Sequence, residues 1–215
     1  GTERVEVSPW PFPPENAGEA PEFRFDPHVW TSPKRARVQV ENLGAGLAAA
    51  APDAAASINA ATASYLEDLD ALDAWATASI ETVPEGQRVL FTSHDAFGYF
   101  SGDYGIRFIG AALTDFNDQQ DATADHIASA VQAVKDSGAV ALFAENSNNS
   151  KSIEAIARGA GVTPIVGDDA LYGDSLGPDG SAGATYVGSI IHNVRAVTDA
   201  WGGTAPALPE RLAGQ

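Results

Sequence analysis

The sequence predicts an α/β fold in which helices cover both faces of a parallel sheet. From Gly86 onward, short runs of β-branched and aromatic residues alternate with helical segments. This alternation is typical of parallel strands joined by crossover helices. Hydrophobic residues make up 44% of the 215 residues, which is enough to bury a core of this size. One α/β lobe is therefore expected in this part of the chain.

Four strands and four helices are expected in this lobe. Glycines 105, 138 and 161 end three of the helices, because glycine favours the position after a helix C-terminus. The strands are predicted at 88–92, 106–111, 139–144 and 163–166, and the helices at 96–103, 123–137, 150–160 and 183–201. The carboxyl ends of parallel strands meet at one edge of a sheet, where ligands bind in folds of this kind.

Two longer helices are predicted ahead of the sheet, at about 33–50 and 54–80. In both, apolar side chains recur at three- and four-residue steps, which is typical of a buried face. They are Ala36, Val40, Leu43 and Leu47 in the first helix, and Ile58, Ala61, Tyr65, Leu69, Leu72 and Ala76 in the second. The second would be about 40 Å long. That length fits either a strut between two bodies or a long helix on the surface of one domain.

These features divide the chain into four parts. Residues 1–31 form a proline-rich segment, 32–84 a helical linker, 85–203 the α/β lobe and 204–215 a tail. No apolar run reaches about 18 residues, so no transmembrane span is expected. The N-terminus has no basic region followed by an apolar one, so no signal peptide is expected either. Methionine is absent even at position 1, which indicates a processed or partial chain.

Composition excludes several kinds of site. Acidic residues outnumber basic ones by 29 to 12, and the net charge of −17 argues against nucleic-acid binding. Without cysteine, a metal must be held by His, Asp, Glu or water. The chain has no GxSxG, HExxH, phosphate-loop or GxGxxG motif. The adjacent Ser93, His94 and Asp95 cannot form a catalytic relay, because neighbouring side chains point in different directions. We therefore expect no enzyme; a flavodoxin-like enzyme with a bound nucleotide or flavin is the residual enzymatic alternative.

Two histidines and one loop could carry chemistry. His28 lies on a turn before a helix, and His94 follows the first predicted strand. The glycine-rich region after the fourth strand offers four aspartates: Asp168, Asp169, Asp174 and Asp179. Two imidazoles and a carboxylate would suit Zn²⁺ or Mn²⁺. The other histidines, His126 and His192, lie within predicted helices, and we expect them to be structural or surface residues.

Four segments in series resemble a known family. They are FDPHVWTSP, TSHDAFGYFSGDYG, ALFAENSNNSKSIEAIARGAGV and YGDSLGPDGSAGATYVGSIIHNV. In this order and spacing, from residue 25 to 201, the chain resembles the zinc/manganese substrate-binding proteins of ABC transporters, the cluster A-I metal-binding lipoproteins. The resemblance implies two Rossmann-like lobes joined by one long helix, with the metal between them. Here it implies the linker helix and a C-terminal Rossmann-like lobe with a four-stranded parallel sheet.

The resemblance also implies a ligand set. His28, His94 and Asp174 match the family's second, third and fourth metal ligands. Histidine rather than glutamate at the third position favours zinc, with manganese as the alternative. Asp26, Asp95 and Glu145 are candidates to hold the second nitrogen of each histidine. For Glu145, a helix-capping or purely structural role is equally consistent with the sequence.

In the family, an N-terminal lobe with the first histidine ligand precedes the DPHVW motif, and we expect that lobe to be missing here. Water or a neighbouring chain would then take the fourth metal position, and an exposed cleft would favour a homo-oligomer or a complementing N-terminal lobe. The implied function is divalent metal binding for ABC-transporter uptake by an extracytoplasmic lipoprotein that meets a membrane permease. The alternative is a cell-surface adhesion or interaction module without a productive metal site.

Overall fold

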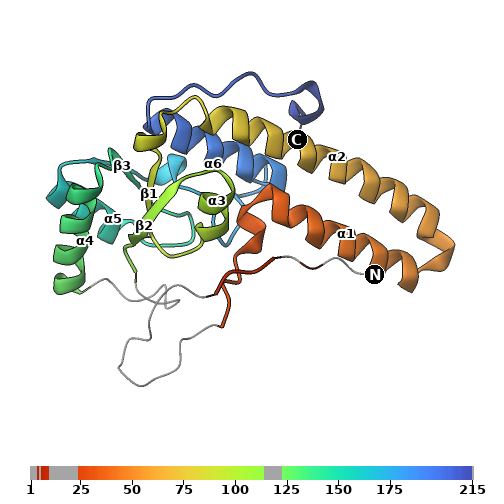
Figure 1. Ribbon diagram of the computed structural model, residues 1–215. Coiled ribbons are helices and arrows are strands. Elements are labelled where there is room, and N and C mark those ends of the chain that lie inside the picture. Colours follow the sequence, from red (N-terminus) through yellow and green to blue (C-terminus); the bar gives the residue numbers. More distant parts are fainter. Residues whose placement is uncertain (1–3, 5, 10–23, 114–122, 215) are drawn as a thin grey trace.

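The computed structural model describes residues 4, 6–9, 24–113 and 123–214 (Figure 1). Most of the proline-rich segment at 1–31 lies outside these residues, and the four-part division of the chain remains a prediction. The helices are α1 (Pro33–Ala50), α2 (Ala55–Ile80), α3 (Gly98–Asp103), α4 (Ala124–Ser137), α5 (Lys151–Ala160) and α6 (Tyr186–Ala200). The strands are β1 (Val89–Thr92), β2 (Arg107–Ala111), β3 (Ala141–Phe143) and β4 (Thr163–Ile165). Every predicted helix and strand is present, with ends shifted by at most a few residues.

The four expected strands are parallel, but their ladder hydrogen bonds join them as two pairs. β1 pairs with β2, and β3 pairs with β4. β1 lies next to β3, and in the described residues polar side chains link the two strands near their carboxyl ends. The backbone N–H of Glu145, just after β3, donates to Ser93 Oγ at 3.1 Å. Side-chain atoms thus take the place of ladder partners where β1 and β3 approach the predicted ligand edge.

Helices cover both faces of these strands, as predicted. Leu90 of β1 and Phe143 of β3 pack into a core cluster with α2 and α6. Val89 and Phe91 of β1 face the opposite way, into a second cluster with α4 and α5. Alternate residues of a strand point to opposite faces, so a strand with two apolar faces must be buried on both. The sheet is therefore the middle layer of the lobe.

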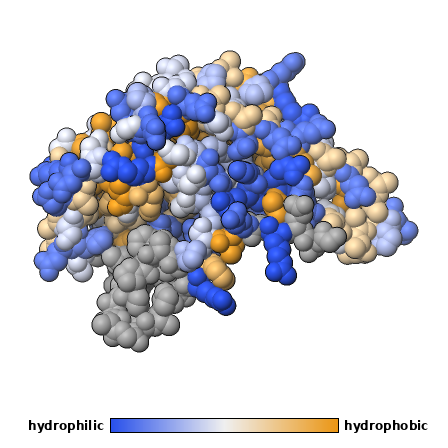
Figure 2. Space-filling view, in the orientation of Figure 1, coloured by the Kyte–Doolittle hydropathy of each residue, from blue (hydrophilic) through white to orange (hydrophobic). Residues whose placement is uncertain are grey.

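In the outer half of the α1–α2 hairpin, the apolar face that was predicted to be buried is exposed. Leu43 is 62% exposed and Leu47 49% exposed, and Ala61 is exposed as well. The hairpin projects beyond the lobe in Figure 1, and within the described residues these side chains stay exposed there. The two helices meet instead at Gly44, where a Cβ would lie 2.6 Å from Thr62 Cγ2. The projecting end shows as pale orange in Figure 2, as expected of an alanine-rich surface.

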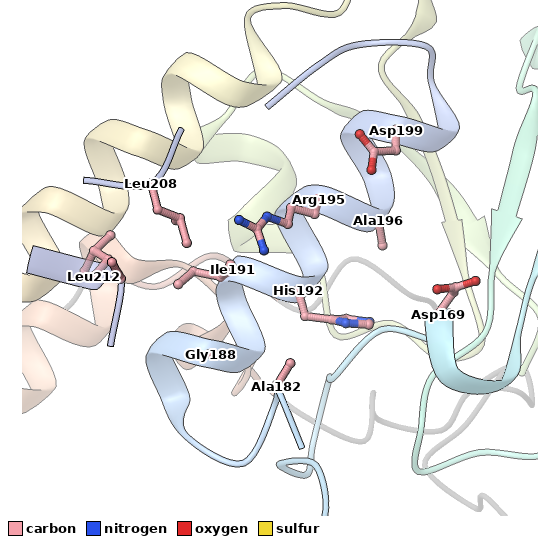
Figure 3. A pocket seen from close by; sticks show the side chains of 11 residues that line it. Asp169, Ala182, Gly188, Ile191, His192, Arg195, Ala196, Asp199, Leu208 and Leu212 are labelled. Carbon is pink, nitrogen blue, oxygen red and sulfur yellow. The ribbon is translucent and has the colours of Figure 1, made fainter. Parts of the chain in front are cut away.

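The inner half of α2 packs into the lobe, and the C-terminal segment covers it. Trp75 Nε1 donates to Pro206 O at 3.0 Å, and Leu212 is 1% exposed. Figure 3 shows Leu208 and Leu212 of this segment beside Ile191 on α6. The segment at 204–214 is thus packed against α2 and α6. Within the described residues, no helix combines the length and apolar character needed to cross a bilayer.

Helix ends in this chain are formed in two different ways. Gly138 and Gly161 adopt left-handed conformations, with φ of 76° and 77°, directly after α4 and α5, as expected. Ser32 lies at the N-cap position of α1 before Pro33, but its hydroxyl does not cap the helix. It donates instead to Asp103 Oδ2 at 2.7 Å. A half-buried carboxylate on α3 therefore accepts from the hydroxyl that could otherwise cap the start of α1.

Candidate metal centre

His28 is held in a short loop just ahead of α1. Its backbone N–H and its ring Nδ1 both contact Asp26 Oδ1, at 2.9 and 2.8 Å. Tyr99 of α3 donates its hydroxyl to Asp26 O at 2.8 Å, which fixes the start of the loop. The histidine side chain is 1% exposed. The loop therefore buries an imidazole whose Nδ1 side is occupied by a carboxylate.

His94 is held at the carboxyl end of β1 by a residue distant in sequence. Its backbone N–H donates to Glu145 Oε1 at 2.9 Å, and its Nδ1 lies 2.8 Å from Glu145 Oε2. The Thr92 hydroxyl donates to His94 O at 2.6 Å. His94 is 3% exposed and Glu145 is essentially buried. The sequence left Glu145 open between two roles, and the structure places its carboxylate directly behind His94.

Asp174 faces both histidines from the glycine-rich loop that follows β4. Leu171, three residues earlier, forms a parallel bridge with Glu145, which brings the loop to the same edge. Asp174 Oδ2 lies 3.0 Å from His94 Nε2, and Oδ1 lies 3.9 Å from His28 Nε2. One candidate ligand atom from each of the three residues lies within 4.8 Å of the others. The spacing of these three residues along the chain could not show that they lie close together; their proximity results from the folding of the chain.

The two histidines present the same nitrogen to Asp174. A carboxylate at Nδ1 favours the tautomer with its proton there, which leaves the Nε2 lone pair available to a metal. The two rings lie edge to face, with centroids 5.4 Å apart. Asp174, at 33% exposure, is the accessible member of the three. The arrangement can therefore hold a cation between two buried imidazoles and one solvent-accessible carboxylate.

The pKa values of the metal-free site reflect this crowding. Burial alone would lower the pKa of His94, but the hydrogen bonds to Asp174 and Glu145 outweigh it and raise the pKa to about 10. Burial alone would raise the pKa of Asp174, but the hydrogen bond and charge of His94 hold it below its usual value. These shifts favour a protonated His94 beside an ionised Asp174 at neutral pH, so a metal must displace that proton to bind His94.

Comparison with known proteins places the chain in a family. The family described as "Zinc-uptake complex component A periplasmic" matches residues 3–200. The chain belongs to this family. The resemblance noted from the four sequence segments is thereby confirmed.

Relatives and solved structures agree with this placement. The chain is 35% identical over 179 residues to the manganese-binding lipoprotein MntA of Bacillus subtilis, covering 82% of this chain and 58% of the relative. It is 33% identical over 184 residues to the zinc-binding protein TroA of Treponema pallidum, covering 83% and 58%. The structure of the periplasmic zinc-binding protein TroA superposes with a TM-score of 0.76 at 30% identity, covering 88% of this chain and 68% of that one. The chain thus spans less than two thirds of the length of these two curated relatives.

The remaining histidines lie away from the three candidate ligands. His126 Nε2 lies 3.2 Å from Ala111 O, and His192 Nε2 lies 2.9 Å from Ala170 O. His192 lines the separate pocket of Figure 3, between α6 and the C-terminal segment. Both are half-buried and in contact with backbone carbonyls. From their mid-helix positions they were expected to be structural or surface residues.

Asp95, a third expected supporting acid, is arranged differently from Asp26 and Glu145. It is 7% exposed, and its Oδ2 has no hydrogen-bond partner among the described residues. Burial raises the pKa of its carboxyl to about 7, and the charges of Asp26 and Glu145 act in the same direction. Asp95 therefore adds a buried acid beside the site, whereas Asp26 and Glu145 hold the rings.

Sequence reasoning missed several residues that shape the site. Trp30 Nε1 donates to Gly173 O at 3.1 Å, and the Trp30 ring lies edge-on to His28 with centroids 5.4 Å apart. A Cβ on Gly98 would lie 2.8 Å from Asp26 Oδ2, and one on Gly173 would overlap Glu145 Oε2. In the sequence, the available signal was that these glycines lie in the AFG and YGD segments next to candidate ligands. Their steric role could not be read without knowing which carboxylate faces them.

Proposed function

We propose that this chain binds a divalent metal ion through His28, His94 and Asp174, as the substrate-binding part of an ABC-type uptake system. The convergence of these three residues carries the proposal, because their ligand atoms can all reach one ion. Membership of the zinc-uptake family supports it. The names of relatives describe metal binding and transport, not adhesion, so the metal function is preferred to the adhesion alternative.

Zinc is the first substrate that we propose, and manganese the alternative. Two imidazoles and one carboxylate form a nitrogen-rich set, which suits zinc, whereas manganese prefers carboxylate and water. Zinc sites usually have four ligands. The fourth position is open to water or to a side chain from outside the described residues, including one from a second copy of the chain. Relatives named for manganese and for zinc both exist, so the choice of metal needs a measurement.

The proposed setting is extracytoplasmic, with a membrane permease as the partner that receives the ion. The family description is periplasmic, and several relatives are named as lipoproteins. The net charge of −17 would attract cations to the protein. Asp174, as the exposed ligand, is the group that an arriving ion would meet first.

Calorimetric titration with Zn²⁺ and Mn²⁺ tests the proposal. The variants are His28→Ala, His94→Ala and Asp174→Asn, and each should weaken binding by more than the ~10–100-fold typical of a residue that only supports a ligand. Asp179→Asn is the matched control, because it removes one negative charge from an exposed site in the same loop. Its affinity should stay close to that of the unmutated chain. The proposal is wrong if the unmutated chain shows no saturable binding, or if Asp179→Asn weakens binding as much as Asp174→Asn.

A further inference from the structure

Gly173 lies where the supports of all three candidate ligands meet. It directly precedes Asp174 and is itself buried. Its Cα faces the carboxylate of Glu145, and its carbonyl accepts the Trp30 indole N–H. Glu145 holds His94, and Trp30 lies against His28. Gly173 therefore contacts Glu145, which supports His94, and Trp30, which packs on His28, and it is bonded directly to Asp174.

We propose that Gly173 is a positioning residue that sets the alignment of His28, His94 and Asp174, and so the affinity and geometry of the metal site. This inference rests on the proposed metal function. On this inference, the absence of a side chain at residue 173 allows the three ligands to keep their relative positions.

The steric part of the proposal concerns Glu145. A Cβ at Gly173 would overlap Oε2 and would lie 3.3 Å from Cδ of Glu145. The carboxylate cannot yield cheaply, because one oxygen accepts the His94 N–H and the other contacts His94 Nδ1. Phe97, 3.6 Å from the same Cβ position, is also buried and limits relaxation there. Any added side chain must therefore displace the Glu145 carboxylate from the position in which it contacts His94.

The second part concerns Trp30. Its indole N–H is bonded to Gly173 O, while its own carbonyl accepts the Tyr186 hydroxyl at 2.7 Å. Trp30 is thus tied at one end to the Asp174 loop and at the other to α6. Because the Trp30 ring lies against the His28 ring, a shift of Gly173 changes the position of His28 relative to Asp174. Gly173 therefore couples the first histidine to the third ligand.

Backbone strain does not explain the choice of glycine. Gly173 is absent from the glycines with positive φ in the described residues, so alanine can adopt its backbone conformation. The effect of Gly173→Ala then reports the contact with Glu145. Gly102 on α3 is a matched control, since a Cβ there meets nothing within 4 Å and its φ is also not positive.

The experiment compares the unmutated chain with Gly173→Ala, Gly102→Ala and Trp30→Phe. Zn²⁺ affinity is measured by calorimetry, ligand geometry by the visible absorption of the Co²⁺-loaded chain, and folding by circular dichroism. We expect Gly173→Ala to lose about 10–100-fold in affinity, as for other residues that orient metal ligands, with an altered Co²⁺ spectrum. Gly102→Ala should match the unmutated chain. Trp30→Phe keeps the aromatic body but loses the indole N–H, and should change the spectrum with a smaller loss of affinity.

Each outcome is decisive. If Gly173→Ala folds and keeps both the affinity and the Co²⁺ spectrum of the unmutated chain, the proposal is overturned. If Gly173→Ala does not fold, Trp30→Phe decides alone, and an unchanged affinity and spectrum in that variant overturn the proposal. If the unmutated chain binds neither Zn²⁺ nor Co²⁺, the proposed metal function itself fails, which is a different result.

Discussion

The two histidines of the candidate site make the same kinds of contact, but the carboxylates that support them come from different parts of the chain. Each has a backbone N–H and a ring Nδ1 in contact with one buried carboxylate, and each presents Nε2 to Asp174. For His28 that carboxylate belongs to Asp26, two residues earlier. For His94 it belongs to Glu145, 51 residues later and just after β3. The first support is a local loop, and the second exists only when β1 and β3 lie side by side.

Because of this difference, the two supporting carboxylates should contribute differently to the stability of the fold. Asp26 orders one turn. The Glu145 carboxylate orients His94 and, by accepting the His94 N–H, also links the ends of β1 and β3, which lack ladder hydrogen bonds to each other in the described residues. A support that spans the fold should affect stability and binding together. A local support should affect binding with less effect on stability.

The largest effect is expected from removing the carboxylates. Glu145→Ala should lower metal affinity by about 10–100-fold and also lower the free energy of unfolding by about 3 kcal/mol, since it leaves His94 without a buried partner. Asp26→Ala should lower affinity by a similar factor with a smaller loss of stability. Calorimetry and urea unfolding of the metal-free variants measure the two effects. Equal losses of stability would contradict the contrast between local and long-range support.

The next largest effect concerns the pH dependence of metal binding, which should differ between variants of the Glu145–His94 pair and of the Asp26–His28 pair. With a pKa of about 10, His94 is protonated in the metal-free site at neutral pH, and a metal must displace that proton. Affinity should therefore rise by about tenfold per pH unit from pH 6.5 to 8.5. Glu145→Gln removes a charge that raises the pKa of His94, so the rise should level off at lower pH. Asp26→Asn should leave the profile unchanged, because Asp26 is not among the groups that raise that pKa.

The same pKa has a consequence for the stability of the metal-free chain. The folded pKa of His94 lies above its unfolded value of about 6.5. The proton is therefore held more tightly in the folded state, and this stabilisation is fully present below pH 6.5. It is lost as the pH rises toward 10. Melting temperatures of the metal-free chain should fall over this range, and less steeply for Glu145→Gln; parallel slopes would contradict the assignment.

The smallest effects are expected from removing two hydroxyls, Tyr99 beside the His28 loop and Thr92 beside His94, each of which donates to a backbone carbonyl. Thr92→Val removes the bond to His94 O, and Tyr99→Phe removes both the bond to Asp26 O and the one that the hydroxyl accepts from the Ser8 N–H. Thr92→Val should cost about 1 kcal/mol of stability, the net value of a typical hydrogen bond, and Tyr99→Phe about 1–2 kcal/mol. Each should cost only a few-fold in metal affinity. Thermal unfolding and calorimetry test both. An affinity loss as large as that of the carboxylate variants would show that the backbone, not the carboxylate, orients the ring.

Much of the fold followed from local patterns in the sequence. Helix and strand positions followed from the apolar repeats and from glycines such as Gly138 and Gly161, because these depend on near neighbours. The candidate ligands His28, His94 and Asp174 came from their motifs, and their convergence supports that choice. Burial of Leu43 and Leu47 was predicted wrongly. An apolar stripe shows which face could be buried, but the overall shape decides whether anything covers it.

By itself the sequence determined the order of the elements and the residue types available as ligands, because these follow from residues close along the chain. It named Asp26 only as one of three candidate supporting acids. Only the tertiary structure decided that Glu145 stands behind His94, that Asp174 faces both rings, and that Gly173 lies against the Glu145 carboxylate. These relations join segments tens of residues apart. They depend on the packing of β1, β3 and the loop after β4, which no local pattern encodes.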